Sequence, residues 1–549
     1  MKIPHIGIVG GGPGALLILK RILELEGADF ALDIFESAPR LGVGMPFSPR
    51  GADLEHDTNV SEEEIPDFEP PLSQWVKSQP SYVLEKYGID PSTFDQTKIL
   101  PRLLFGEYLA EQFSILLKEA EHRGMEVKIH LETNVTDIKD DVKKKKAAII
   151  AGDKTYLFDT VIICSGHFWP HDHERELAGY FDSPYPPSKL NRVFNHPVAL
   201  RGSSLTAVDA IRTISRNNGY FTHENSRLVY SRNENAPNFK MAMYSHNGLL
   251  PCARIHLEEP NINNSDILPT ARLKENMAEN EGFLSLDFLF DLGYKELLKH
   301  KDPEFFAQIK DMKVEEFSKY MLSKREQRDA FELLREEYLD GVDSLQTKRP
   351  VPWKEALSAF SFALNFPAKH MSAEDMIRLH EHLLPLVAIV IAYLPPSSCE
   401  ELLALHDAGC LELVSVEKFE AKISDKDKIV CTCIFEDKED IVVEYETFVD
   451  CIGQPNIQFE EFPFKSLMKD GTVSPARLNF KSNKGHQNVD GLQISDSFQV
   501  VNEKGEANKR IYLLTVAFMK GLNPDYSGID LFEHASELVV KDIFKAFRI

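Results

Sequence analysis

The sequence is poor in positive charge. Its 62 lysine and arginine residues are outnumbered by 86 aspartate and glutamate residues, which gives a formal net charge of -24. Binding to nucleic acid or to an anionic membrane surface requires basic residues that contact phosphate groups. The charge balance therefore argues against both kinds of partner, and a small molecule is the expected ligand.

Cysteine is also scarce. The seven cysteines lie between Cys164 and Cys451, their number is odd, and no C-x-x-C pair occurs. This usage indicates no disulfide framework and is typical of a reducing compartment. We therefore expect a cytoplasmic protein, and we expect no metal site.

No apolar run is long enough to cross a membrane. The most hydrophobic internal run, residues 383–394, contains Pro385 and is shorter than the about 20 residues that a membrane-spanning helix needs. The apolar start of the chain is interrupted by glycines, so it does not match a cleavable signal peptide. The sequence predicts a protein that is not associated with a membrane.

A strand, a glycine-rich turn and a helix follow one another at the start of the chain. Residues 6–9 form an apolar run, and Gly10, Gly12 and Ala15 then match the pattern G-x-G-x-x-A. In a dinucleotide-binding fold the first glycine allows a tight turn, the second lets the backbone approach a pyrophosphate, and the third small residue lets helix and strand pack closely. Glu36 ends the next predicted strand, where an acid binds ribose hydroxyls.

A second, weaker motif lies in the middle of the chain. After a short apolar strand, Gly202, Ser204 and Ala207 match the pattern G-x-S-x-x-A and lead into a predicted helix. Ser245 follows the next predicted strand, at the position that contacts the ribose of a bound nucleotide. Because neither Ser245 nor His246 is decisively basic, the choice between NADPH and NADH stays open.

The predicted fold class is α/β, a two-dinucleotide-binding (Rossmann-like) flavoprotein with a mostly helical insertion. The insertion is predicted because residues 269–396 consist of long, charged, amphipathic runs without glycine motifs. The predicted division is an N-terminal part of the FAD-binding domain (1–190), a first part of the NAD(P)-binding domain (191–268), the helical insertion as a substrate cap (269–396), a return to the NAD(P)-binding domain (397–456) and a C-terminal part of the FAD-binding domain (457–549).

Six motifs together resemble the bacterial FAD-NAD(P)-binding family, which is allied to flavin-dependent N-hydroxylating and related monooxygenases. They are GIVGGGPG (7–14), RLGVGMP (40–46), TNV (58–60), PRLLFGEYL (101–109), GSSLTAVD (202–209) and GLLP (248–251). The resemblance implies that the first motif holds FAD and that the second holds NAD(P)H. The chain lacks the F-x-G-x-x-x-H-x-x-x-[WYF] fingerprint of Baeyer–Villiger monooxygenases and the paired cysteines of disulfide reductases.

The resemblance implies an FAD-dependent, NAD(P)H-driven oxidoreductase, most simply a monooxygenase of a small, amine-bearing molecule. The flavin carries the chemistry in such enzymes, so no side chain needs to act as a nucleophile. The polar residues expected nearest the flavin or the substrate are Asn59, Arg102, Asp525 and Tyr526. The residues expected to bind the cofactors are Gly10, Gly11, Gly12, Pro13, Gly14, Ala15, Glu36, Gly44, Met45, Asn59, Arg102, Val135, Ser165, Gly166, Gly202, Ser203, Ser204, Leu205, Thr206, Ser245, Gly453 and Gly521.

Two alternatives use the same motifs. The first is an oxygen-independent NAD(P)H:acceptor oxidoreductase, which needs both nucleotides but no oxygen. The second is a non-catalytic dinucleotide sensor or scaffold that binds another protein through the acidic helical insertion. The sequence leaves the substrate and the oligomeric state undetermined.

Overall fold

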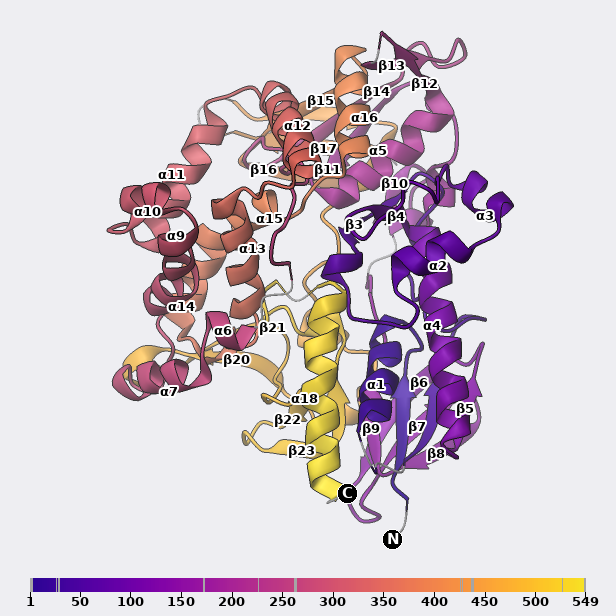
Figure 1. Ribbon diagram of the computed structural model, residues 1–549, viewed down its shortest axis with the longest axis vertical. Coiled ribbons are helices and arrows are strands. Elements are labelled where there is room, and N and C mark those ends of the chain that lie inside the picture. The colour runs from indigo at the N-terminus through magenta and orange to yellow at the C-terminus, as the bar shows by residue number, and fades with distance from the viewer. Residues whose placement is uncertain are drawn as a thin grey trace.

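The computed structural model describes residues 3–25, 27, 30–170, 173–225, 227–260, 264–424, 426, 428–435, 439–525 and 527–547. Figure 1 shows three regions: one built from both ends of the chain, a second built around a parallel sheet, and a stack of helices beside them. All seven cysteines are buried and unpaired. Among the described helices, none has the length and apolar content that a bilayer crossing requires.

The first sheet joins the two ends of the chain. Its strand order is β22-β23-β9-β1-β2-β5, and every neighbouring pair except β22 and β23 is parallel. The central strands are apolar and buried on both faces, as parallel strands covered by helices are. The strands are β1 (His5–Val9), β2 (Ala31–Phe35), β5 (Val127–His130), β9 (Thr160–Ile163), β22 (Gln499–Val501) and β23 (Ala507–Leu513).

Helices from both ends of the chain cover this sheet. The C-terminal helix α18 (Ile529–Phe547) packs against α1 (Pro13–Glu24), and α1 also packs against α4 (Arg102–His122). Smaller elements surround them. These are α2 (Leu72–Ser78), α3 (Ser81–Lys86), α17 (Lys465–Lys469), the pair β3 (Asp57–Ser61) and β4 (Ile99–Pro101), the sheet of β6 (Val135–Asp141), β7 (Lys146–Ala151) and β8 (Lys154–Phe158), and the pair β20 (Pro475–Asn479) and β21 (His486–Leu492).

The second sheet is entirely parallel, with the order β10-β19-β11-β14-β15. Its strand β10 (Tyr180–Phe181) lies before residue 190, yet it pairs with β19. The remaining strands are β11 (Pro197–Arg201), β14 (Lys240–Ser245), β15 (Leu411–Ser415) and β19 (Thr447–Asp450), and the helices beside them are α5 (Leu205–Asn218) and α16 (Pro396–Asp407). Two antiparallel units complete the region: β12 (Gly219–Glu224) with β13 (Arg227–Arg232), and β16 (Lys418–Ile423), β17 (Ile429–Ile434) and β18 (Ile441–Tyr445).

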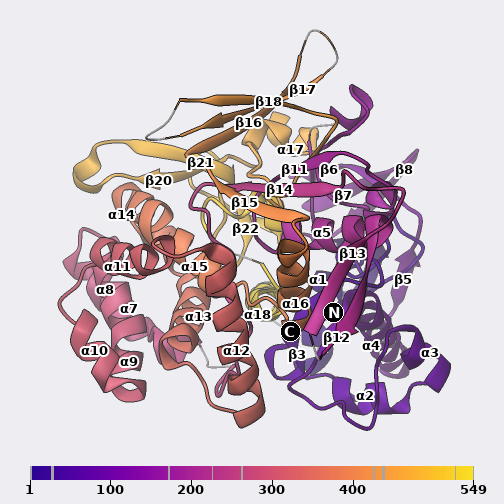
Figure 2. The same ribbon diagram turned by 90° about the horizontal axis from the view of Figure 1, so that it is seen from above.

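The helical segment, residues 264–390, stands beside both sheets (Figures 1 and 2). Most of its buried apolar side chains belong to the same cluster as those of the first sheet, whereas Phe331 and Leu334 of α12 belong to the cluster of the second sheet. The segment is therefore packed mainly onto the first sheet's region and touches the second through α12. Its helices are α6 (Asn264–Ile267), α7 (Thr270–Glu279), α8 (Leu286–Phe290), α9 (Glu296–Lys301), α10 (Pro303–Ile309), α11 (Val314–Glu326), α12 (Ala330–Thr347), α13 (Pro352–Leu364), α14 (Ala373–Arg378) and α15 (Leu384–Val390), with π-helical turns at Asp291–Lys295 and Leu379–Leu383.

Candidate functional site

A cavity of about 1370 Å³, which we call the main cavity, opens at the carboxyl ends of the first sheet's strands. Val9 and Cys164, at the ends of β1 and β9, line it, and so does Glu36 after β2. Ligands of open parallel sheets bind at this edge. The position of the cavity is therefore that of a nucleotide site.

The glycine turn after β1 forms one wall of the main cavity. Gly10 has a φ of +100°, and a Cβ there would lie 2.2 Å from the Cys164 carbonyl oxygen, so only glycine fits. A Cβ on Gly12 would lie 3.2 Å from the Cα of Gly44 across the cavity wall. Helix α1 begins directly afterwards without a side-chain cap, which leaves backbone N–H groups for an anion. The turn fits a pyrophosphate, because side chains are missing where one would approach.

Glu36 is held in place by the backbone around it. Its carboxylate accepts hydrogen bonds of 2.7 Å from the N–H of Gly11 and of 2.7 Å from the N–H of Ala38. Gly11 itself faces away from the main cavity, since a Cβ there would lie 2.4 Å from Leu41. The acid after β2 is thus fixed at the rim of the main cavity, where the sequence predicts a ribose.

The helix that follows the second glycine motif reaches the same main cavity. Gly202, with a φ of +112°, turns the chain from β11 toward α5, and a Cβ there would lie 2.9 Å from the Cys451 carbonyl oxygen. Ser203 is buried and donates a hydrogen bond of 2.7 Å to the Leu249 carbonyl oxygen. The first residues of α5, Leu205 and Thr206, line the main cavity.

Comparison with known proteins identifies the part of the chain that contains the first glycine motif. Residues 7–168 match the family model described as FAD-NAD(P)-binding. These residues form the N-terminal part of an FAD-NAD(P)-binding domain, whose sheet is completed by β22 and β23 from the C-terminal part of the chain. Residues 270–391, within the helical segment, match the model described as YdhS-like middle domain. The chain is 27% identical over 466 residues to the uncharacterized protein YdhS of Escherichia coli strain K12, covering 84% of this chain and 85% of that protein.

Two solved structures are similar in fold. L-lysine 6-monooxygenase from Pseudomonas syringae has a TM-score of 0.50 at 11% identity, with 99% of each chain covered. A reduced ornithine hydroxylase from Pseudomonas aeruginosa has a TM-score of 0.49 at 10% identity, with 100% of each chain covered. The chain has the two-dinucleotide fold of flavin-dependent, NAD(P)H-linked oxidoreductases, with the helical segment in addition.

The structure brings fourteen of the sequence-predicted residues to the wall of the main cavity. They are Gly10, Gly12, Pro13, Gly14, Glu36, Gly44, Met45, Asn59, Val135, Ser165, Gly166, Leu205, Thr206 and Asp525. Others stand outside its lining: Gly11, Ala15, Arg102, Gly202, Ser203, Ser204, Ser245, Gly453 and Gly521. Tyr526 lies outside the described residues. Several of the residues outside the lining lie in turns next to residues that line the main cavity. A Cβ added to Gly453, for example, would lie 3.4 Å from the hydroxyl oxygen of Thr206.

Arg102 joins the FAD-NAD(P)-binding domain to the second sheet. Its guanidinium contacts the carboxylate of Asp209 on α5 and donates a hydrogen bond of 3.0 Å to the Asp57 carbonyl oxygen. Tyr185 donates a hydrogen bond of 2.6 Å to the same carboxylate oxygen of Asp209. Burial opposes the ionisation of Asp209, but the Arg102 and His56 charges and the hydrogen bonds from Tyr185 and Arg102 together outweigh it, and the pKa of Asp209 is lowered. The side chain expected near the flavin is therefore engaged in an ion pair that bridges two regions.

Replacing Arg102 by methionine is expected to destabilise the fold. The variant Arg102→Met leaves the buried Asp209 carboxylate without its cation, which costs about 3–5 kcal/mol of unfolding free energy. Denaturant unfolding measures the loss. Lys128→Met removes a fully exposed ion pair with Glu126 and is expected to leave the stability close to that of the wild type, because water screens such a pair. Equal losses in both variants would contradict the bridging role.

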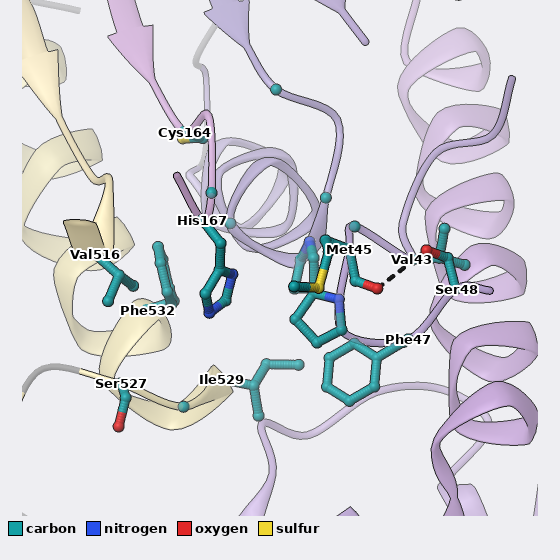
Figure 3. A pocket seen from close by; sticks show the side chains of 18 of the residues that line it. Val43, Met45, Phe47, Ser48, Cys164, His167, Val516, Ser527, Ile529 and Phe532 are labelled. Carbon is teal, nitrogen blue, oxygen red and sulfur yellow. Dashed lines mark hydrogen bonds between the residues drawn. The ribbon is translucent and has the colours of Figure 1, made fainter. Parts of the chain in front are cut away.

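His167 lines the main cavity, although no motif in the sequence indicates a role for it. The imidazole points between Met45 and Phe532 in Figure 3. Burial, with the nearby Lys520 charge, lowers the pKa of His167 to about 4, so the ring is neutral at pH 7. The one sequence signal for it is its place directly after Ser165 and Gly166, at the end of a strand in the FAD-NAD(P)-binding domain.

The helical segment and the stretch directly after it supply another part of the wall of the main cavity. Ser358 and Phe362 come from α13, Ala388 from α15, and Ile391 and Tyr393 from the stretch after α15. No local pattern identifies these residues, because each one resembles an ordinary core or turn residue in sequence. They are brought to the main cavity only by the way the helical segment packs.

Proposed function

We propose that the chain is an FAD-dependent, NAD(P)H-driven oxidoreductase, and that it is a monooxygenase acting on a small, amine-bearing molecule. One observation carries the proposal: a single cavity is lined by the first glycine turn, by the start of α5 after the second glycine motif, and by the helical segment. Two nucleotides and a substrate could thus meet there. The seven unpaired cysteines support the reducing cytoplasm as the compartment.

The residues present fit these groups. Gly12 and Gly44 leave room for a pyrophosphate, Glu36 stands where a ribose hydroxyl would bind, and Thr206 stands at the start of the second helix. When bound, the flavin would accept a hydride and, once reduced, react with oxygen. The protein would contribute position and exclusion of water, and a neutral His167 adds no charge to this region.

The monooxygenase part of the proposal follows the name of the similar solved structure, L-lysine 6-monooxygenase, whose fold this chain shares. The amine-bearing substrate follows the same name. The helical segment and the stretch directly after it are the part expected to select the substrate, because they bring Phe362 and Tyr393 to the wall of the main cavity.

Spectroscopy of the purified protein tests the reductive half of the proposal. We expect a yellow protein that bleaches under anaerobic conditions when NADPH or NADH is added, because both nucleotides reach one cavity. Titrating the two nucleotides separately decides the preference between them. Colourless protein that takes up no FAD would favour a scaffold, and yellow protein that neither nucleotide bleaches would remove the reductive step.

Oxygen consumption tests the oxidative half. With NAD(P)H and a panel of small amines, a monooxygenase consumes oxygen and forms a hydroxylated product in proportion to the nucleotide oxidised. Nucleotide oxidation by an added acceptor without oxygen uptake would instead favour the oxygen-independent reductase. If peroxide forms without a hydroxylated product, the tested amines are not substrates of the enzyme.

A further inference from the structure

Three carboxyl groups gather in the main cavity near the start of α18. Glu64 follows β3, Asp525 precedes α18, and Asp530 lies in the first turn of α18; all three line the main cavity. The neighbouring Ser527 and Ile529 mark this segment in Figure 3. Like charges this close together oppose one another's ionisation. The partners of each carboxyl group decide which of them keeps its proton.

Two of the three groups have fixed partners. Glu64 pairs with the buried Arg254 and accepts hydrogen bonds of 2.8 Å and 2.9 Å from the N–H and the hydroxyl of Ser61. Asp525 accepts a hydrogen bond of 2.8 Å from the hydroxyl of Ser361 on α13. Burial raises the pKa of Asp525, and the Ser361 hydrogen bond and the nearby Lys520 charge act against that rise. Both groups therefore have positive charges or donors that face them.

Asp530 has a different environment. Its Oδ1 accepts a hydrogen bond of 2.9 Å from the N–H of Leu531, and among the described basic residues none forms an ion pair with it. Burial raises the pKa of Asp530 to about 8, and the charges of Glu64 and Asp525 add to the effect of burial. At pH 7 the group is a neutral carboxylic acid that lines the main cavity, and it therefore has a proton to give.

A buried hydroxyl in the main cavity is poorly satisfied. Tyr393 is 4% exposed and lines the main cavity; among the described residues its hydroxyl has no partner in good hydrogen-bond geometry, and Ser358 on α13 is the side chain close enough to interact with it. Glu64 lies close enough to interact with the charge of ionised Tyr393, as it does with that of Asp530. Buried polar groups are normally hydrogen-bonded, so a poorly satisfied donor at a cavity wall points to a ligand that satisfies it. The Tyr393 hydroxyl and the Asp530 acid therefore line the same cavity, and a ligand bound there is exposed to both residues.

We propose that Asp530 supplies the proton that is consumed with each hydride in this cavity. The inference rests on the proposed function. Oxygenation of a substrate consumes NAD(P)H, one proton and O₂, and yields NAD(P)⁺, the oxygenated product and water; reduction of another acceptor likewise consumes one hydride and one proton. The O–H bond of the Asp530 carboxyl group breaks, its proton goes to the reduced acceptor, and the carboxylate regains a proton from the solvent.

Infrared spectroscopy of the whole protein tests the protonation state without using activity. We expect a carboxylic-acid carbonyl band that is present at pH 7, disappears with a midpoint near pH 8, and is absent in Asp530→Asn. Asp525→Asn is the matched control, because it removes a neighbouring carboxyl group on the same cavity wall. It is expected to keep the band, with a midpoint at or below the wild-type one, since a like charge has been removed.

Steady-state kinetics of the flavin-loaded protein tests the transfer. We expect the kcat of the wild type to fall above about pH 8. We expect Asp530→Asn to lower kcat by about 10²–10³-fold at pH 7, and the decrease of kcat near pH 8 to be absent from that variant. Asp530→Glu, which restores a carboxyl group, is expected to recover part of kcat and the decrease of kcat at alkaline pH. Flavin content, measured for each variant, separates loss of the proton from loss of the flavin.

The two measurements give outcomes that overturn the inference separately from the proposed function. Asp530 is not the proton source if the carboxylic-acid band persists in Asp530→Asn. The same conclusion follows if that variant keeps the wild-type kcat and the decrease of kcat near pH 8. A protein that binds no FAD or oxidises no NAD(P)H removes the proposed function, and the proton-transfer role falls with it. In that case the infrared band still shows whether Asp530 holds its proton.

Discussion

Gly12→Val is expected to abolish FAD retention while leaving the protein folded. A Cβ at residue 12 already comes within 3.2 Å of the Cα of Gly44, and the two further carbons of valine would occupy the approach to the helix start. The φ of Gly12 is −82°, so valine causes no backbone strain there. The loss would therefore come from blocked pyrophosphate contact, which the second glycine of this motif permits.

The measurement is the ratio of flavin to protein absorbance after purification, with thermal unfolding of the FAD-free protein beside it. Gly10→Ala is the contrasting variant: its Cβ would lie 2.2 Å from the Cys164 carbonyl oxygen in a left-handed backbone conformation. That variant is expected to lower the unfolding temperature as well as the flavin content. If the Gly12→Val protein keeps the wild-type flavin content, the first glycine turn is not the pyrophosphate site of FAD.

Gly202→Val is expected to spare FAD but to slow its reduction by NAD(P)H. The residue has a φ of +112°, and its Cβ would lie 2.9 Å from the Cys451 carbonyl oxygen, so valine would displace the turn that leads to Leu205 and Thr206. Because those two residues line the main cavity, the displacement would misplace the hydride donor. A misplacement of about 1 Å can lower a rate on the order of 10²-fold.

Stopped-flow reduction of the FAD-loaded variant under anaerobic conditions provides the measurement. Gly505→Val is the matched control, because Gly505 also has a positive φ, of +79°, but no atom lies within 4 Å of its added Cβ. It is expected to keep the wild-type rate of reduction. Equal flavin loss in Gly12→Val and Gly202→Val would show that the assignment of the two motifs to two nucleotides is wrong.

The sequence alone was sufficient for the features that depend on neighbouring residues. The turn at Gly10 and Gly12 follows a strand and starts a helix, and each of these properties is written within about fifteen residues. The same holds for the turn at Gly202. The family model described as FAD-NAD(P)-binding confirms the predicted family and cofactors for residues 7–168. Strand β6, in contrast, consists mostly of polar residues and has no apolar pattern to reveal it.

Only the tertiary structure decides which distant residues meet. Arg102 contacts Asp209 on α5, 107 residues later in the chain. A side chain that was expected at the flavin therefore connects the first region to the second. Strand β23 completes the first sheet next to β9, and α18 brings Asp530 to the cavity that the glycine turn of the first residues also lines. These pairings depend on how whole elements pack. Local spacing in a chain fixes a turn or a helix, but it carries no information about which buried charge will lie opposite another.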